Sequence, residues 1–205
     1  MHDVHRRLGE LGAATVHEVV GPDSACGPEL RAVWQDAIVA GPALTVEGHP
    51  GDNLALHQAL EAAEPGQVLV VALGGHLAGY WGEVLTVAAM ERGVQGLVID
   101  GGVRDTREIE SLGFPVFARG TALRGTGKHH DGRLGKGVVV AGVHVHAGDV
   151  VVGDRDGVTV VPRDSVADVL ERAEARVAKE ADFMERLRAG ATTVELLGLA
   201  SAKGQ

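Results

Sequence analysis

Two short apolar runs, separated by a helical stretch, constrain the fold of this chain more than any other feature of its sequence. The runs cover residues 68–73 and 96–100, and glycines follow each of them. Continuous apolar runs of this length are typical of strands that are covered on both faces of a parallel sheet. Residues 83–92 between them have the pattern of a helix that ends at Gly93. The segment therefore predicts a parallel βαβ unit with a right-handed crossover.

Strand and helix patterns alternate along the rest of the chain as well. The predicted strands cover residues 36–46, 68–73, 96–100, 115–118, 138–140, 143–145, 150–152 and 158–161. The predicted helical segments cover residues 8–20, 51–63, 83–92, 104–112, 164–188 and 194–199. Asp52 or Asn53 is the expected N-cap of the second helical segment. No linker divides the chain, and its length suffices for one core. We therefore expect a single α/β domain over residues 1–205.

Charge and hydropathy narrow the classes of partner. The formal net charge of −9 argues against a nucleic-acid partner, because phosphate binding needs a basic surface. No stretch approaches the roughly 20 apolar residues of a membrane span. The N-terminal residues carry no apolar run of the secretory type. The sequence thus favours a cytoplasmic protein with a small-molecule ligand.

The loops that follow the two apolar runs are expected to meet. Both leave the carboxyl ends of parallel strands, which is the edge where open α/β sheets bind ligands. The first loop ends in Gly79-Tyr80-Trp81-Gly82 and leads into the helix that starts at Glu83. Free amides at such a helix start can bind a carboxylate. A glycine loop that only makes a tight turn is the competing interpretation.

The second loop carries Arg104 and Asp105. An arginine can bind a carboxylate or a 2-oxo acid through two hydrogen bonds, and an aspartate can hold Mg²⁺. Glu83 has the residue type of a general acid or base. Each of these acids also has a simpler interpretation, since carboxylates are common in the first turn of a helix. Two histidine pairs, His129-His130 and His144/His146, have no further ligand at metal-binding spacing, and we interpret them as surface residues.

Taken together, these segments resemble a known family, the 4-hydroxy-4-methyl-2-oxoglutarate / 4-carboxy-4-hydroxy-2-oxoadipate aldolases. These are class II pyruvate aldolases of the superfamily that includes the regulators of ribonuclease activity A. The most specific markers are Trp81-Gly82-Glu83 and the run from Val98 to Asp105, and the similarity covers nearly the whole chain. It implies a compact fold like the swivelling β/β/α domains, assembled as a homotrimer or homohexamer with sites between subunits.

The resemblance also assigns roles to residues. It implies that Asp105 ligates Mg²⁺ or Mn²⁺, that Arg104 binds the 2-oxo acid, and that Glu83 positions the water that protonates an enolate. The carboxylate of the substrate would bind to the helix start at Gly82, Val84 and Leu85. In the outer shell of the metal, the family's pattern points to Glu180 of a neighbouring subunit, with Asp182 as the alternative. Lys128 matches a family lysine to which we assign no role.

The implied activity is metal-dependent cleavage of 4-hydroxy-2-oxo acids to pyruvate, with oxaloacetate decarboxylation through the same enolate. Two alternatives stay open at this point, namely a dedicated oxaloacetate decarboxylase and a non-catalytic protein that regulates a ribonuclease. Both share the fold, so the fold alone cannot separate them. The joint presence of Glu83, Arg104 and Asp105 favours an enzyme. The sequence leaves the preferred 2-oxo acid, the metal and the number of subunits undetermined.

Overall fold

The structure of the chain is a computed structural model that describes residues 2–200. Met1 and residues 201–205, at the ends of the predicted domain, lie outside the described residues. The strands are β1 (Arg31–Ala32), β2 (Val39–Glu47), β3 (Val68–Ala72), β4 (Gly96–Val103), β5 (Val116–Thr121), β6 (Arg133–Leu134), β7 (Val138–Val140), β8 (Val143–Val145), β9 (Val150–Asp154) and β10 (Gly157–Val161). The α-helices are α1 (His2–Leu11), α2 (Ala13–Val20), α3 (Leu54–Ala62), α4 (Glu83–Glu91), α5 (Thr106–Ser111), α6 (Val166–Arg188) and α7 (Thr193–Leu196).

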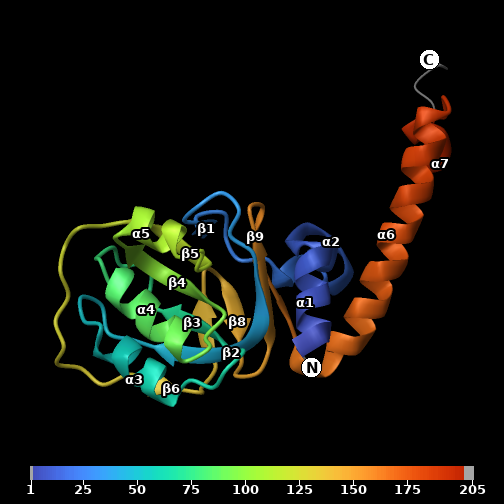
Figure 1. Cartoon of the computed structure of the whole chain (residues 1–205). Helices are drawn as coiled ribbons and strands as arrows, with labels where there is room; N and C mark the ends of the chain where they lie inside the picture. The colour runs from blue at the N-terminus through green and yellow to red at the C-terminus, as the bar shows by residue number, and fades with distance from the viewer. Residues whose placement is uncertain (1, 201–205) are drawn as a thin grey trace.

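Parallel strands in the order β5-β4-β3-β2 form the centre of the main sheet. The helices α3, α4 and α5 lie together beside these strands (Figure 1). Every residue of β4 is buried, as is nearly all of β3, because side chains pack against both faces. The structure therefore confirms the α/β fold with parallel βαβ units that the apolar runs predict.

Antiparallel strands extend the sheet until its two ends approach each other. β1 pairs with β5 at one end, while β9 and β10 follow β2 at the other, and β6 also pairs with β2. Ala25 forms a bridge with Thr159 of β10, and β1 contacts β10. The sheet is thus nearly closed into a barrel. The hairpin of β7 and β8 forms a separate two-stranded sheet.

Three apolar clusters hold the described elements together. One lies between the parallel strands and α3, α4 and α5, and it includes Trp81 and Phe114. The second fills the space between the sheet and the β7–β8 hairpin, with Phe117 as its largest side chain. The third joins α1, α2 and the start of α6 to β9 and β10. Valine, leucine and alanine dominate all three, since aromatic residues make up only 3% of the chain.

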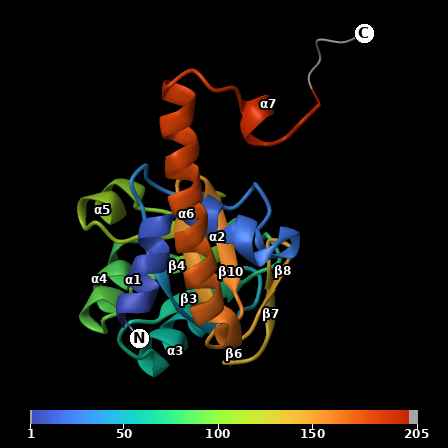
Figure 2. The ribbon, with the colours of Figure 1, turned by 90° about the vertical axis from the view of Figure 1, so that its right-hand side faces the viewer.

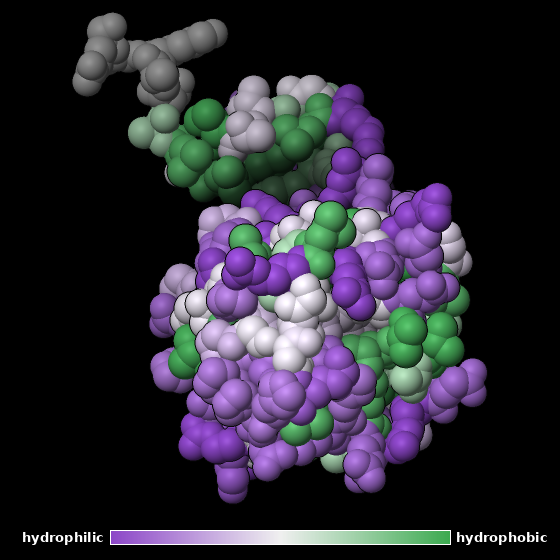
Figure 3. Space-filling model, turned by 90° about the vertical axis from the view of Figure 1, so that its left-hand side faces the viewer, coloured by the Kyte–Doolittle hydropathy of each residue, from purple (hydrophilic) through white to green (hydrophobic). Residues whose placement is uncertain are grey.

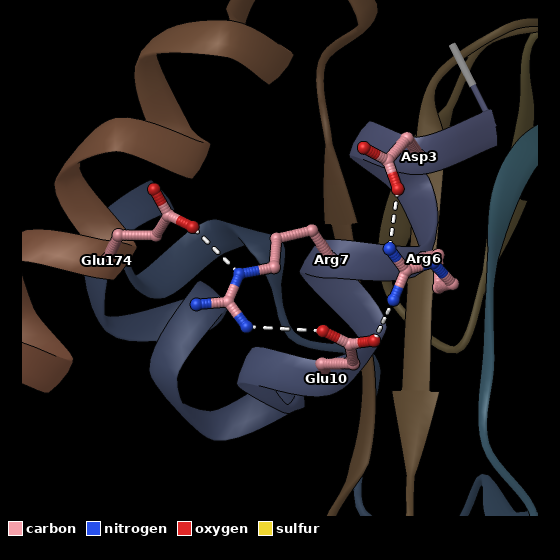
Figure 4. A network of polar contacts seen from close by, with 5 residues as sticks. All are labelled: Asp3, Arg6, Arg7, Glu10 and Glu174. Atoms are coloured by element: carbon pink, nitrogen blue, oxygen red, sulfur yellow. Dashed lines mark hydrogen bonds and ion pairs between the residues drawn. The ribbon is translucent and has the colours of Figure 1, made fainter.

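The C-terminal helix α6 is present as predicted and projects beyond the rest of the fold (Figures 1 and 2). Only Val169 and Ala173 of this helix are buried. A polar network fixes its first half, because Arg7 of α1 bridges Glu174 of α6 at 2.7 Å and Glu10 at 3.2 Å (Figure 4). None of the helices described, α6 included, combines the length and the apolar character that a bilayer span requires.

Several predicted boundaries differ from the structure, and two of them lie near the predicted ligand edge. β4 continues to Val103 instead of ending at Asp100, because Trp81 from the preceding loop pairs with Val103. The helix predicted from Arg104 begins only at Thr106, since Asp105 adopts a left-handed backbone conformation with φ 56°. Arg104 and Asp105 therefore lie in a short turn between strand and helix, not in the helix itself.

Candidate active site

Asp105 is fixed against the start of α4. Its Oδ2 accepts a hydrogen bond from the Glu83 backbone N–H at 3.1 Å. A Cβ atom added at Gly82 would lie only 2.3 Å from this oxygen, so the carboxylate occupies space that only glycine leaves open. A positive φ is unfavourable for residues other than glycine, although aspartate tolerates it better than most. Such conformations are concentrated at functional sites.

The loop over residues 74–82 is held between β4 and the segment that follows β5. The Arg104 N–H donates to the Trp81 carbonyl at 2.9 Å, and the Gly79 N–H donates to the Arg124 carbonyl at 2.7 Å. The buried Trp81 indole donates to Thr86 Oγ1 at 2.8 Å, which ties the loop to α4. These bonds explain why the two predicted loops meet at one edge of the sheet, as expected from their strands.

Arg104 lies across the two glycines of this loop. A Cβ atom at Gly79 would be 3.0 Å from Arg104 Cδ, and one at Gly82 would be 3.3 Å from Arg104 Cγ. The Nε atom of Arg104 lies 3.8 Å from Asp105 Oδ2. The aliphatic stem therefore packs on backbone, while the guanidinium stays beside the carboxylate and half exposed. A cation and an anion are both available to a ligand here.

A pocket of about 320 Å³ opens at this point. This volume is in the range of small-molecule sites. Its lining comes from the loop before α4, the start of α4, the turn after β4, the start of α3 and the segment after β5. The lining residues are Asn53, His57, Gly79, Tyr80, Gly82, Val84, Leu85, Arg104, Asp105, Gly125, Thr126 and Lys128.

Most of the residues predicted from the sequence lie in this pocket, but two do not. Glu83 is not among the described residues that line the pocket. Its backbone N–H donates to the Asp105 carboxylate, which does line it. Glu180 lies on α6, on the far side of the sheet from α4 and α5, and pairs with Arg176 at 2.9 Å (Figure 1). Glu180 of the same chain is thus remote from Asp105, so a role at this site requires a second copy of the chain.

Several lining residues were not predicted as site residues, among them Tyr80 in the loop before α4, and Asn53 and His57, which are distant from that loop in sequence. The Tyr80 side chain is almost fully buried, and its hydroxyl accepts from the Gly51 N–H at 2.6 Å and lies 2.6 Å from His76 Nδ1. The Asn53 amide donates to the Tyr80 carbonyl at 3.0 Å, while its Oδ1 is buried without a partner among the described residues. His57 follows one turn later on α3.

A buried carboxylate anchors the segment that carries Lys128. Asp52 accepts from the His129 N–H at 2.6 Å through Oδ2 and from the Leu54 N–H at 3.0 Å through Oδ1. Burial opposes its ionisation, but these backbone hydrogen bonds outweigh it and lower the pKa of Asp52 to about 2. His130 lies 3.5 Å from the same carboxylate and stacks on His49. His129 and His130 are exposed, as predicted, and they contact this anchor through the His129 backbone N–H and the His130 ring.

His144 and His146 are exposed on and just after β8, as predicted. Within residues 2–200, no three His, Cys, Asp or Glu side chains gather in a way that could hold a metal ion. Asp105 fits a different kind of site, since Mg²⁺ is usually held by one or two carboxylates together with water and substrate oxygens. The glycine cradle at Gly82 and the exposed part of the carboxylate are consistent with such a ligand.

Comparison with known proteins places this chain in a family. The sequence pattern of RraA-like proteins, Aldolase/RraA, matches residues 13–160. A Halalkalibacterium halodurans protein described as a "putative 4-hydroxy-4-methyl-2-oxoglutarate aldolase" is 40% identical over 152 residues, which cover 74% of this chain and 71% of that protein.

Two solved structures are also similar. An uncharacterized protein from Pseudomonas syringae superimposes with a TM-score of 0.86 at 26% identity, over 96% of this chain and 93% of the other. The RNA-processing inhibitor RraA from Thermus thermophilis superimposes with a TM-score of 0.62 at 30% identity, over 67% of this chain and 84% of the other. With its matching sequence pattern, its aldolase-named relative and its shared fold, the chain belongs to the RraA-like Aldolase/RraA family.

Proposed function

We propose that the protein is a divalent-metal-dependent lyase that cleaves 4-hydroxy-2-oxo acids of the 4-hydroxy-4-methyl-2-oxoglutarate type and also decarboxylates oxaloacetate. The observation that carries this proposal is the contact of Asp105 with the start of α4, beside Arg104, in one pocket. The name of the Halalkalibacterium halodurans relative supports the substrate class. The carboxylate suits a metal ion, and the guanidinium and the free amides suit an anionic 2-oxo acid.

The start of α4 is the binding site that we propose for the C1 carboxylate of the substrate. The first amides of a helix lack acceptors within the helix, and the helix dipole favours an anion there. The Glu83 N–H already donates to Asp105, which leaves the N–H groups of Val84 and Leu85 for the substrate. Both residues line the pocket. Binding here orients the 2-oxo group toward Arg104 and Asp105.

Cleavage requires that negative charge develops on the 2-oxo oxygen. A water molecule accepts the proton of the 4-hydroxyl, the C3–C4 bond breaks, and C4 leaves as the carbonyl carbon of the second product. The electron pair of the broken bond forms the enolate of pyruvate. The Arg104 guanidinium stabilises this charge in the transition state more than in the ground state. Mg²⁺ or Mn²⁺ bound at Asp105 would supply a Lewis acid for the same oxygen. Glu83 is the first residue of α4, next to the pocket lining, and its carboxylate would position the water that returns a proton to C3 before pyruvate is released.

Decarboxylation of oxaloacetate follows the same course at the same atoms. The C3–C4 bond breaks, carbon dioxide leaves, and the enolate of pyruvate is protonated at C3. One pocket with one charge-stabilising arginine therefore serves both reactions. Because oxaloacetate carries no hydroxyl proton at C4 that a base must remove, it is the less demanding of the two substrates.

We also propose that the chain is a single domain that assembles as a homotrimer or homohexamer. The exposed apolar side chains Met184, Leu187, Leu197 and Leu199 of the C-terminal part support this. Figure 3 shows hydrophobic surface on the part of the molecule that projects from the rest of the fold. Large exposed apolar patches are typical of interaction surfaces. Glu180, or Asp182 in its place, would reach the outer shell of the metal only from a neighbouring subunit.

The test is pyruvate release from 4-hydroxy-4-methyl-2-oxoglutarate and from oxaloacetate, first with Mg²⁺ and then with EDTA. We expect pyruvate from both substrates and its loss on chelation. Pyruvate from oxaloacetate alone would establish a dedicated decarboxylase. No pyruvate from either substrate, together with a stable complex with a ribonuclease, would favour a regulatory role like that of the Thermus thermophilis RraA, which is described as an RNA-processing inhibitor.

A further inference from the structure

The strand that leads to the site, β4, is irregular just before its end. The register of β4 and β5 shifts between Ile99 and Gly102. On β4 this interval contains two residues, Asp100 and Gly101, while a single residue of β5, Arg119, lies opposite them. The extra residue makes a β-bulge, and bulges beside functional sites re-aim the residues that follow them. The turn that carries the arginine and the aspartate of the site follows this bulge directly.

An ion pair joins the two strands across this bulge. The side chain of Asp100 is only 6% exposed, and its carboxylate accepts a hydrogen bond from Arg119 Nε. Glu29, a second acid in contact with Arg119, lies 3.2 Å from Nη2 and is much more exposed. A carboxylate is costly to remove from water unless a cation and hydrogen bonds compensate for it. Displacement of either partner would leave a buried charge unpaired, so the contact of Asp100 with Arg119 holds the bulge in place.

The loop that leads to α4 packs on the same ion pair. The Gly75 N–H donates to the Asp100 carbonyl at 3.1 Å, and a Cβ atom at Gly75 would lie 3.0 Å from Arg119 Nε. Further along β4, a Cβ atom at Gly102 would lie only 2.6 Å from the Ala78 carbonyl oxygen. The loop therefore contacts both the ion pair and the bulge, and its far end forms the start of α4.

The ion pair acts on the site through other residues. Neither Asp100 nor Arg119 is among the described residues that line the pocket. We infer that they are a positioning pair, which fixes the bulge and thereby the contact of Asp105 with the start of α4. The inference rests on the proposed function, in which this contact is the centre of the site. Without the pair, the end of β4 and the loop before α4 lose their common support, and the Asp105 carboxylate moves away from the Glu83 N–H.

The Glu83 amide reports this position without any reaction. Its N–H donates to Asp105 Oδ2 at 3.1 Å, and the first residue of a helix has no acceptor for its N–H within the helix. Hydrogen exchange of this amide is measured in the wild-type protein, Arg119→Met, Asp100→Asn and the double variant. The double variant removes both charges, so it leaves no unpaired buried charge that would prevent folding. Arg133→Met, which removes an exposed ion pair between β6 and β2, is the matched control.

Exchange of the Glu83 amide should be about 10-fold faster in the three variants, because the site opens locally more often, and unchanged in Arg133→Met. The kcat for pyruvate release from oxaloacetate should fall by about 10- to 100-fold in the same variants. The double variant should be no slower than the slower single variant, since Asp100 and Arg119 act as one unit.

A pair that only stabilises the fold would lower the melting temperature and leave both the exchange rate and kcat of the folded double variant unchanged, and this result overturns the inference. Faster exchange with a wild-type kcat overturns it as well. If the wild-type protein releases no pyruvate, the exchange rates alone decide. Faster exchange then supports the positioning role of Asp100 and Arg119, and only the proposed reaction fails.

Discussion

Replacement of Gly82 by alanine is a direct test of the contact on which the proposed site depends. The new Cβ would lie 2.3 Å from Asp105 Oδ2 and 3.1 Å from Asp105 Cγ. The backbone itself accepts alanine, because Gly82 has φ −161° and ψ −165°, an extended conformation. The perturbation therefore acts on the Asp105 carboxylate and on the Arg104 stem beside it, not on the local fold.

The size of the effect follows from the overlap. Ordinary van der Waals contact begins at 3.4 Å, so the carboxylate oxygen must retreat by about 1 Å. A displacement of this size at a reacting centre typically costs about 100-fold in rate. We expect Gly82→Ala to lower kcat/KM for pyruvate release by about two orders of magnitude. The melting temperature should change by only a few degrees, as for most single substitutions outside the core.

The assay is pyruvate release from oxaloacetate with Mg²⁺, followed through a coupled reduction of pyruvate. Gly120→Ala is the matched control, since a Cβ at Gly120 meets nothing within 4 Å and the residue lies in neighbouring β5. The control should keep wild-type kinetics. Wild-type activity in a correctly folded Gly82→Ala protein would refute the argument that the position of Asp105 controls the reaction.

Two other predictions concern the polar groups that support the pocket. Tyr80→Phe should lower the free energy of unfolding by about 1–3 kcal/mol in a urea titration, because the Gly51 N–H then loses its acceptor; an unchanged midpoint would contradict this. Asp52 has a pKa of about 2 in the folded protein against 3.8 for the ordinary group, so its contribution to stability is complete above pH 4 and is lost as the pH falls toward 2. Asp52→Asn should therefore lose less stability than the wild-type protein between pH 5 and pH 3, and equal losses would show that the carboxylate does not anchor the Lys128 segment.

The approach of Glu83 and Asp105 could be predicted from the sequence, because hydrophobic periodicity and sheet topology suffice to place both residues. Apolar runs identify β3 and β4 as neighbouring parallel strands, and the rule that their carboxyl ends share an edge brings Glu83 and Asp105 together. The hydrogen bond from the Glu83 N–H to Asp105 at 3.1 Å agrees with this expectation. The left-handed conformation of Asp105 could not be predicted, since no glycine at this position signals a positive φ.

The part of the pocket wall that comes from α3 and the segment after β5 was missed because its residues meet only through long-range contacts. His57 has the pattern of an ordinary helix residue, and Lys128 lies in a segment without regular structure. Asp52 was considered only as a cap for α3, although its second carboxylate oxygen accepts from the His129 N–H, 77 residues away. The unusual pair His129-His130 was the available signal, and its position beside Lys128 pointed to the segment that forms this wall.

The most direct test of the proposed function is pyruvate release by Asp105→Asn beside the wild-type protein, with 4-hydroxy-4-methyl-2-oxoglutarate and saturating Mg²⁺. Asparagine tolerates the left-handed conformation and can still accept from the Glu83 N–H, so the substitution removes the charge and little else. We expect the wild-type protein to release pyruvate and Asp105→Asn to fall to background. Full activity in Asp105→Asn would contradict the claim that this carboxylate is the centre of a metal-dependent lyase.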